Sequence, residues 1–393
     1  MTEFKDVLVI GAGLTGLATA RVLAMNSVNY LVLEQNSDVG GRMRSEVYED
    51  CILDHGFQVV LPAYPSVRAL KLSIPLKPFS RAASCFSPDG HFVVADPIHH
   101  PVHFIGNLSR TKSMIPDYFR MVKHIFSRRF DLSTEQILET LGYSESFKSS
   151  FLKPFLRGVL LDPTLDCPSP LSSYFLEQFF YGGASLVQGG IREFPRAIAE
   201  NLDIRFHSEV PELSQSEFKT SDGKSYAAKI IVDTRPNANQ QNIAWHGTHC
   251  HYFLSSKPVP FGRRITLCST DLPTCINQIA NLSEVDLSYS PNGTALLSVT
   301  SRGEANFEVA QIQRELASML ELPESQVNHL KSVHVEKAVP VTKHLSADFP
   351  EPSLPIHIGN TIFASDTFSY GSQHAALRMG EQAGKMATDA LKI

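Results

Sequence analysis

Apolar and polar positions near the N-terminus predict a strand, a helix and a second strand in close succession. Residues 7–10 are entirely apolar, as expected of a central parallel strand that is buried on both faces. Leu17, Ala20 and Leu23 then recur with helical spacing, and a second apolar run covers residues 30–33. This order of elements predicts a parallel sheet of the α/β class.

Patterns further along the chain predict additional helices and a second sheet. Residues 133–183 have helical spacing, and Ser133 with Gln136 forms a capping-box pattern at the start of that region. Apolar and polar residues alternate over 296–300, and residues 307–320 return to helical spacing. We therefore expect an antiparallel sheet and several helices in addition to the parallel sheet.

Length and composition narrow the class of protein. The chain of 393 residues is long enough for two domains, and its 43% hydrophobic and 19% charged residues are typical of a globular protein. A net charge of −5 gives no reason to expect nucleic acid as a partner. Six cysteines without a CxxC pair are typical of reduced thiols, so we expect a cytoplasmic protein.

The loop between the first strand and the first helix has the composition of a dinucleotide-binding turn. Gly11 permits the tight turn, Gly13 lets a pyrophosphate approach the backbone, and Gly16 lets the helix pack close to the strand. The helix N-terminus offers N–H groups to phosphates. Glu34 ends the second strand where an acid binds ribose and disfavours NADP. The candidate contacts in this stretch are Gly11, Gly13, Leu14, Thr15, Gly16, Glu34 and Gln35.

A second glycine pair, Gly40 and Gly41, precedes Arg42 a few residues after the second strand. Adjacent glycines allow close backbone approach, and a guanidinium can pair with a phosphate through two hydrogen bonds. Together with Arg44 and Ser45, this stretch resembles the GGRxRS/T motif of the flavin-containing amine oxidase and phytoene desaturase superfamily. The resemblance implies that Gly40, Gly41 and Arg42 lie along the pyrophosphate of FAD, which favours FAD over NAD.

Segments elsewhere in the chain carry the same resemblance. Residues 54–58 resemble the family segment near the flavin ring, and Glu209 with Val210 takes the place of the strand beside the adenine. A predicted strand at 361–364 and a helix from about residue 375 to 391 resemble the C-terminal element of the family, whose aspartate and loop contact FAD. The further contacts that the resemblance implies are Gly56, Phe57, Val210, Asp366, Gly371, Ser372 and Gln373.

The resemblance extends over nearly the whole chain but is less specific in the middle. Residues 153–162, 188–191 and 276–278 resemble motifs of bacterial and plastid desaturase-like flavoproteins. Ser365 departs from the glycine that usually precedes the aspartate. No cysteine follows Cys275, which excludes the C-terminal cysteinyl–flavin bond of monoamine oxidases, so we expect FAD to be bound non-covalently.

Because the cofactor motifs lie near opposite ends of the sequence, the expected FAD-binding domain is discontinuous. We expect residues 1–75, 186–245 and 345–393 to form a Rossmann-type domain with a parallel sheet. Residues 76–185 and 246–344 are expected to form a substrate-binding α+β domain with an antiparallel sheet.

Two further features have competing interpretations. His246, His249, Cys250 and His251 are close in sequence, but neighbouring positions of a strand face opposite sides and no second ligand cluster stands out, so we expect no metal site. Residues 110–129 form a basic amphipathic pattern. We favour a helix whose apolar face packs on the protein, and the alternative is peripheral contact with an anionic membrane.

The leading functional hypothesis is an FAD-dependent oxidoreductase that takes a hydride from a C–H bond of a small, largely apolar substrate. The flavin carries the chemistry in such enzymes, and we assign no side chain as a catalytic acid or base. One alternative is an amine or amino-acid oxidase, for which Arg157 and Arg302 are candidate carboxylate anchors. Another is a flavin-dependent isomerase, or a protein that binds FAD without net redox turnover.

Overall fold

A mostly parallel sheet forms the first part of the fold. The computed structural model describes residues 2–95, 101–102, 104–106, 112–211, 213, 217–236, 243–303 and 305–392. The strands of this sheet are β1 (Thr2–Ile10), β2 (Tyr30–Leu33), β9 (Ile204–Arg205), β10 (Glu217–Lys219), β11 (Ser225–Asp233), β17 (Ile356–Ile358) and β18 (Thr361–Phe363). Their order is β17-β18-β11-β1-β2-β9, and β10 pairs with β11.

Strand β1 lies at the centre of this sheet, as the sequence predicted. It pairs in parallel with both β11 and β2, so that Val9 lies opposite Val232 and Val32. All four residues from Val7 to Ile10 are buried because helices or other strands cover both faces. The parallel sheet therefore brings the first strands of the chain and the last strand, β18, into one layer.

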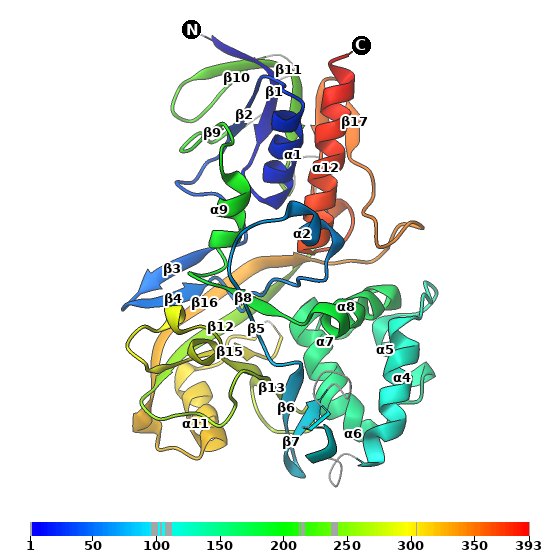
Figure 1. The fold of residues 1–393 in the computed structure, drawn as a ribbon, viewed down its shortest axis with the longest axis vertical. Coiled ribbons are helices and arrows are strands. Elements are labelled where there is room, and N and C mark those ends of the chain that lie inside the picture. The colour runs from blue at the N-terminus through cyan, green and yellow to red at the C-terminus, as the bar shows by residue number, and fades with distance from the viewer. Residues whose placement is uncertain are drawn as a thin grey trace.

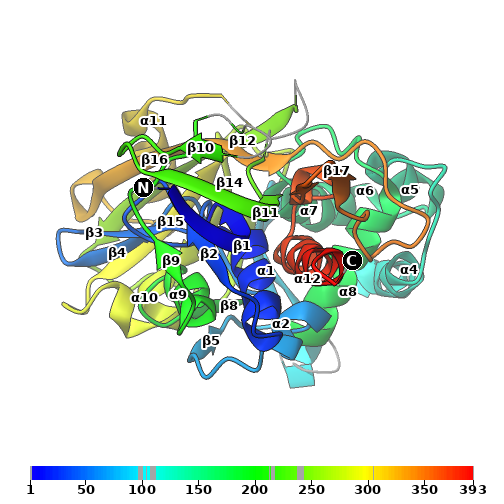
Figure 2. The same ribbon diagram turned by 90° about the horizontal axis from the view of Figure 1, so that it is seen from above.

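Two helices pack closely on this sheet and on each other. Helix α1 (Leu14–Met25) and helix α12 (Gln373–Ala390) run side by side, as Figures 1 and 2 show. A Cβ atom on Gly380 would lie 2.2 Å from the carbonyl oxygen of Thr15, so only glycine permits this approach. The Thr19 hydroxyl donates a hydrogen bond to the Gly380 carbonyl at 3.1 Å. Helix α9 (Glu193–Ala199) also contacts α1.

A second, mainly antiparallel sheet forms the other part of the fold. Its strands are β6 (Ala82–Ser87), β7 (Gly90–Ala95), β12 (Trp245–Ser255), β13 (Ile265–Cys268), β14 (Ile276–Asn281), β15 (Ala295–Ser301) and β16 (Val327–Pro340). The order is β16-β12-β15-β14-β13-β6-β7, and only the β13–β6 pair is parallel. Together the two sheets confirm the predicted fold class.

Most of the helices near the second sheet come from the middle of the chain. They are α4 (Ile115–Ile125), α5 (Thr134–Thr140), α6 (Glu145–Phe147), α7 (Lys153–Leu160) and α8 (Ser169–Gly182). Figure 1 shows them gathered beside this sheet, with α4 and α5 on the outer side. The predicted capping box is present, because the Ser133 and Gln136 side chains each bond the backbone N–H of the other.

The remaining elements are short or lie at the edges of these layers. They are α2 (Pro65–Leu70), α10 (Leu282–Val285), α11 (Val309–Leu320) and the paired strands β3 (Ser45–Tyr48) with β4 (Cys51–Asp54) and β5 (Leu76–Pro78) with β8 (Ser185–Val187). Two predicted helix starts were wrong by two residues. Helix α11 begins at Val309 rather than Phe307, and α12 begins at Gln373 rather than Ala375. No helix among the described residues is long and apolar enough to cross a membrane.

Candidate functional site

A cavity of about 1060 Å³ lies between the two parts of the fold. Residues from both ends of the chain and from the second sheet line it. The predicted cofactor contacts that line it are Gly11, Gly13, Leu14, Thr15, Glu34, Gln35, Gly40, Gly41, Arg42, Phe57, Val210, Asp366, Gly371, Ser372 and Gln373. Gly16 and Gly56 are the two predicted contacts that do not line it.

The first glycine turn leaves open space in front of helix α1. A Cβ atom added to Gly13, the residue before α1, would meet no atom within 4 Å, although Gly13 lines the cavity. Gly16 has the opposite environment, because its Cβ would lie 1.9 Å from the Gly11 carbonyl oxygen. Gly16 therefore supports packing of the helix against the turn, whereas Gly13 leaves room for a ligand at the N-terminus of α1.

Glu34 lies at the end of β2 with its carboxylate held by backbone N–H groups. Its Oε2 accepts a hydrogen bond from Ala12 N at 2.7 Å, and its Oε1 accepts one from Asn36 N at 2.9 Å. Oε1 also accepts a hydrogen bond from Asn36 Nδ2 at 2.6 Å, so both of its lone pairs are used, whereas Oε2 can accept one further hydrogen bond. Glu34 is 5% exposed and lines the cavity. Its carboxylate is therefore a hydrogen-bond acceptor that the backbone holds in place beside the first glycine turn.

Arg42 connects the second glycine motif with the C-terminal segment. Its guanidinium donates a hydrogen bond to Asp366 Oδ2 at 2.5 Å and another to the Ala338 carbonyl at 3.1 Å. The guanidinium carbon also lies 5.4 Å from the centre of the Trp245 ring, within cation–π range. Gly40 has a φ of 113°, which side-chain-bearing residues rarely adopt, so glycine is required at this turn.

The N-terminus of α12 presents a polar group that lacks a partner. Ser372 caps the helix by accepting a hydrogen bond from Ala375 N at 2.9 Å, which explains why the helix starts before Ala375. Gln373 donates through Nε2 to the Val59 carbonyl at 2.8 Å, but its buried Oε1 has no hydrogen-bond partner. Both side chains line the cavity.

The sequence did not predict several residues that the fold brings to the cavity near Val210. Ser208, Thr234 and Arg235 line the cavity beside Val210. Arg235 donates a hydrogen bond from Nη1 to the Val210 carbonyl at 2.5 Å and forms an ion pair with Asp233. Thr234 follows β11, so its position at the carboxyl end of a central parallel strand was the available signal.

Apolar side chains line one part of the cavity and form a chamber. We define this chamber by the lining residues Leu61, Tyr64, Phe155, Gly158, Val159, Phe175, Phe179, Ile265 and Gln278. Phe155 and Phe179 pack edge to face with centroids 4.8 Å apart. Tyr64 is 2% exposed and stacks on Tyr174 of α8. None of the nine lining residues is charged at neutral pH.

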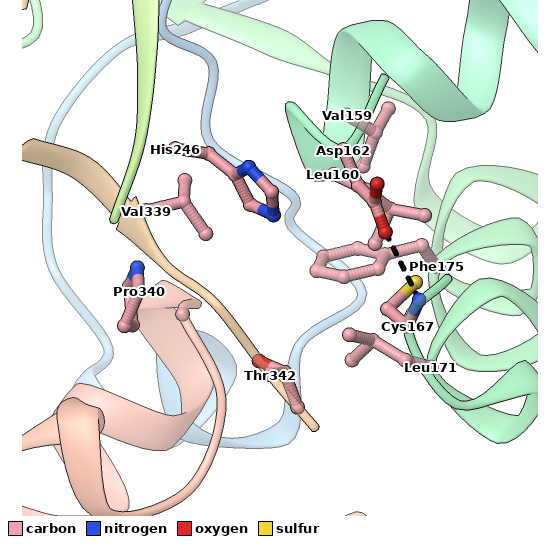
Figure 3. A pocket seen from close by; sticks show the side chains of 11 residues that line it. Val159, Leu160, Asp162, Cys167, Leu171, Phe175, His246, Val339, Pro340 and Thr342 are labelled. Carbon is pink, nitrogen blue, oxygen red and sulfur yellow. Dashed lines mark hydrogen bonds between the residues drawn. The ribbon is translucent and has the colours of Figure 1, made fainter. Parts of the chain in front are cut away.

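A second, much smaller cavity adjoins the main one (Figure 3). Val159, Phe175, Val339 and Gly371 line both cavities. The side chains of His246 and Asp162 enter the small cavity from the two parts of the fold that flank it. Burial raises the pKa of Asp162, but hydrogen bonds from Cys167 N and Thr164 outweigh burial, so the pKa of this carboxyl is lowered.

Asp54 is a buried carboxyl that joins the two parts of the fold near the cavity. Oδ1 accepts hydrogen bonds from the Ser45 hydroxyl at 2.6 Å and from Ile191 N at 2.9 Å, and Oδ2 accepts one from the Tyr289 hydroxyl at 2.8 Å. Burial raises the pKa of Asp54 to about 6, although these hydrogen bonds oppose the shift. The neighbouring His55 lines the cavity, and burial lowers its pKa.

The two candidate carboxylate anchors lie outside the cavity. Arg302 donates to the Leu272 and Ser269 carbonyls. Neither Arg302 nor Arg157 lines the cavity, so the structure does not bring these two candidate carboxylate anchors to it.

The histidine-rich strand has the alternation that the sequence predicted. His249 stacks on His334 with centroids 4.0 Å apart and faces the same side as His251, whereas Cys250 bonds Ser298 on the other side. Within the described part of the chain, no group of three or more His, Cys, Asp or Glu residues is arranged to hold a metal ion. His251 is buried, which lowers its pKa to about 4.

The family model for flavin-containing amine oxidoreductases matches residues 14–245. This match covers more than half of the chain. The chain belongs to this family. The predicted resemblance is therefore confirmed, and family membership together with the fold supports FAD as the cofactor.

The proteins to which this chain is similar are described as enzymes of different kinds. The chain is 25% identical over 259 residues to mouse lysine-specific histone demethylase 1B, covering 61% of this chain and 31% of that protein. It is 24% identical over 256 residues to rice polyamine oxidase 4, covering 59% of this chain and 51% of that protein. The matched region thus spans about half or less of these relatives. A solved putrescine oxidase bound to putrescine has the same fold, with a TM-score of 0.71, 16% identity and full coverage of both chains.

The residues around the main cavity fit FAD in shape and chemistry. The open space at Gly13 and the N-terminus of α1 suit a pyrophosphate, and Arg42 supplies a cation beside it. Glu34 offers its Oε2 as an acceptor that suits a ribose hydroxyl. The unpartnered Gln373 Oε1 suits a donor such as a ring N–H. A cavity lined by polar groups at the glycine turns and by apolar side chains from α7 and α8 matches a dinucleotide site followed by a substrate chamber.

Proposed function

We propose that the chain is an FAD-dependent oxidoreductase that removes a hydride from a C–H bond of a small, largely apolar substrate. The observation that carries this proposal is the uncharged, aromatic chamber that continues from the cofactor cavity. Bound FAD supplies the hydride acceptor. The protein's own residues hold the cofactor without a covalent bond, exclude water through Phe155, Phe175 and Phe179, and orient the substrate.

We propose the following division of work among the cofactor contacts. Gly11, Gly13 and the N-terminus of α1 hold the pyrophosphate, while Glu34 and Val210 hold the adenosine. Arg42 and Asp366 orient the middle of the cofactor, and the loop from Gly371 to Gln373 faces the flavin. This assignment accords with a discontinuous FAD-binding domain of residues 1–75, 186–245 and 345–393 and a substrate-binding domain of residues 76–185 and 246–344.

The alternative of an amine or amino-acid oxidase is less consistent with the chamber. An ammonium group or a carboxylate buried there would need an opposite charge, because an unpaired buried charge is costly. The nine chamber residues supply none. An isomerase, or a protein that binds FAD without net turnover, would have the same binding residues, so kinetics must separate these alternatives from an oxidoreductase.

The test is anaerobic mixing of the FAD-loaded protein with candidate substrates while the visible absorption of the flavin is recorded. An oxidoreductase bleaches the flavin in proportion to the substrate consumed. If apolar substrates are converted only after chemical pre-reduction, with the flavin remaining reduced, the isomerase is correct. Purified protein that binds no FAD would overturn the whole proposal.

We also propose that α4 makes peripheral contact with an anionic membrane through residues 110–129. The structure describes residues 112–129 of this segment; Arg110 and Thr111 lie outside the described residues. Tyr118 and Ile125 pack on the protein, whereas Phe119 is 69% exposed and Phe126 is 65% exposed. The helix therefore has apolar side chains both on its packed face and on its solvent face.

Ion pairs within the protein reduce the positive charge that α4 and the residues after it can offer to an anionic membrane. Lys123 is exposed, but Arg128 and Arg129 form ion pairs with Glu177 and Asp131. We therefore expect exposed apolar side chains to contribute most of the membrane affinity.

Co-flotation with phosphatidylcholine vesicles, with and without phosphatidylserine, tests the membrane contact. The double substitution of Phe119→Ser and Phe126→Ser should abolish flotation, whereas Leu354→Ser, at a residue 70% exposed elsewhere, should not. Wild-type protein that stays with the soluble fraction in both vesicle types refutes the proposal.

A further inference from the structure

The apolar chamber contains one side-chain amide, that of Gln278 on β14. Gln278 is 7% exposed and lines the cavity, so its amide is largely removed from solvent. No described residue forms a hydrogen bond with this amide, in contrast to the neighbouring Asn277, which donates through Nδ2 to the Pro154 carbonyl at 3.1 Å. A buried amide without a protein partner carries a desolvation cost that a ligand can relieve.

Two sequence motifs that the cofactor does not explain meet at this amide. Residues 153–162 contain Gly158 on α7, and residues 276–278 end in Gln278 on β14. A Cβ atom on Gly158 would lie 2.3 Å from Gln278 Oε1, so the absence of a side chain at Gly158 gives the amide its position. The hydrogen bond from Asn277 to Pro154 fastens α7 to β14 beside it.

The surroundings of the amide set its chemical selectivity. Phe155, Val159 and Ile265 line the same chamber and offer no hydrogen-bonding side chain. Tyr64 carries the chamber's one hydroxyl, and burial raises its pKa well above the usual value, so it stays neutral. A ligand with a carboxylate or ammonium group would lose its hydration without gaining an opposite charge.

We propose that Gln278 is the specificity-determining residue of the site, and that it binds an uncharged hydrogen-bonding group, such as a carbonyl, amide or hydroxyl, on an otherwise apolar substrate. This inference rests on the proposed function, because it names the substrate class of the same chamber. A primary amide can donate and accept, so it matches a neutral polar group of either kind. Substrates that lack such a group leave the amide unpaired and bind less tightly.

The test measures binding of uncharged and charged probes of similar size to the FAD-loaded protein. Benzamide, ethylbenzene, benzoate and benzylammonium are titrated while perturbation of the flavin absorption is followed, and equilibrium dialysis provides a second readout. We expect benzamide to bind tightest. Gln278→Leu should lower the affinity for benzamide roughly 5- to 10-fold, as expected for the loss of one or two hydrogen bonds. The affinity for ethylbenzene should stay unchanged or increase.

Two further variants separate recognition by the amide from general packing. Gly158→Ala should displace the Gln278 amide without removing it. This variant should therefore lower the affinity for benzamide as Gln278→Leu does. Thr300 lies opposite Gln278 in the register of β14 and β15, and its buried hydroxyl has no partner, but it does not line the cavity. Thr300→Val is therefore the matched control and should leave the affinity for every probe unchanged.

The inference is overturned if Gln278→Leu leaves benzamide affinity unchanged, if Thr300→Val weakens it equally, or if the wild type binds benzoate or benzylammonium as tightly as benzamide. Failure of all four probes to bind at millimolar concentration also overturns it. These outcomes are distinct from failure of the proposed function. Probe binding needs no turnover, whereas the proposed function fails when bound apolar substrates never reduce the flavin.

Discussion

Arg42 and Asp366 form an ion pair with 2.5 Å between Nη2 and Oδ2, although 324 positions separate them in the sequence. Asp366 is almost fully buried and Arg42 is partly exposed to the cavity. The pair joins the second glycine motif to the segment before α12. It therefore joins two segments from opposite ends of the chain that we propose to bind the cofactor.

Replacing Asp366 with Asn should lower the affinity for FAD by roughly 10-fold or more. The substitution keeps the size of the side chain but removes the charge that orients Arg42, and a hydrogen bond to a charged group contributes about 1.5–3 kcal/mol. Flavin fluorescence titration of the apoprotein measures the effect. Asp389→Asn, an exposed position on α12 paired with Lys392, is the matched control, and an equal loss of affinity in both variants contradicts the prediction.

Gly13 and Gly16 should respond differently to substitution by alanine. Gly16→Ala places a methyl group 1.9 Å from the Gly11 carbonyl oxygen and should lower the free energy of unfolding by about 3 kcal/mol or more. Gly13→Ala meets no atom within 4 Å, and its φ of −73° suits alanine. The loss at this helix cap should stay within about 1 kcal/mol.

The two glycine variants should therefore separate stability from cofactor binding. Gly13→Ala should fold and yet bind FAD weakly, because the methyl group would occupy space in the cavity. Denaturant unfolding of the apoprotein and FAD titration measure the two properties. A Gly13→Ala protein with wild-type FAD affinity would show that no cofactor approaches this turn.

Glu34→Ala should lower both the affinity for FAD and the stability of the apoprotein. The carboxylate accepts hydrogen bonds from Ala12 N and Asn36 N, and buried N–H groups left without an acceptor cost about 1–3 kcal/mol. Calorimetry of the apoprotein and FAD titration are the measurements. Glu200→Ala removes an exposed acid that does not line the cavity and should change neither quantity appreciably. FAD affinity that is unchanged in Glu34→Ala means that the acid does not hold the cofactor.

Asp54 should make the protein less stable as the pH rises from about 4 to about 6. Burial raises its pKa to about 6 in the folded state from an ordinary value of 3.8, so the folded protein binds the proton more tightly than the unfolded chain. Its contribution is present below pH 4 and is lost as the pH passes through 6. A shift of this size is worth on the order of 3 kcal/mol.

Unfolding of wild type and Asp54→Asn across this pH range measures the contribution of Asp54. The amide does not ionise, so the difference in stability between the two proteins should change by about the same amount over the interval. Parallel pH profiles of the two proteins would show that the Asp54 carboxyl titrates normally.

The sequence by itself determined the fold class, the family and FAD as the cofactor. Residues 7–10 and the glycines after them predict a dinucleotide turn because strand burial, turn geometry and helix start are all local properties. The capping box at Ser133 was predictable for the same reason. The positions of the helix starts were less accurate, since a cap such as Ser372 at α12 depends on the backbone conformation.

Only the tertiary structure decided which distant residues share the cavity. Thr234 and Arg235 reach it because β11 lies beside β1, a pairing that no local pattern specifies. Arg302 lies outside it because its guanidinium binds backbone carbonyls. Gln278 emerged as an unpaired amide only when β14 was placed against α7. Long-range packing determines burial and partners, and these in turn decide whether a polar side chain supports the fold or faces a ligand.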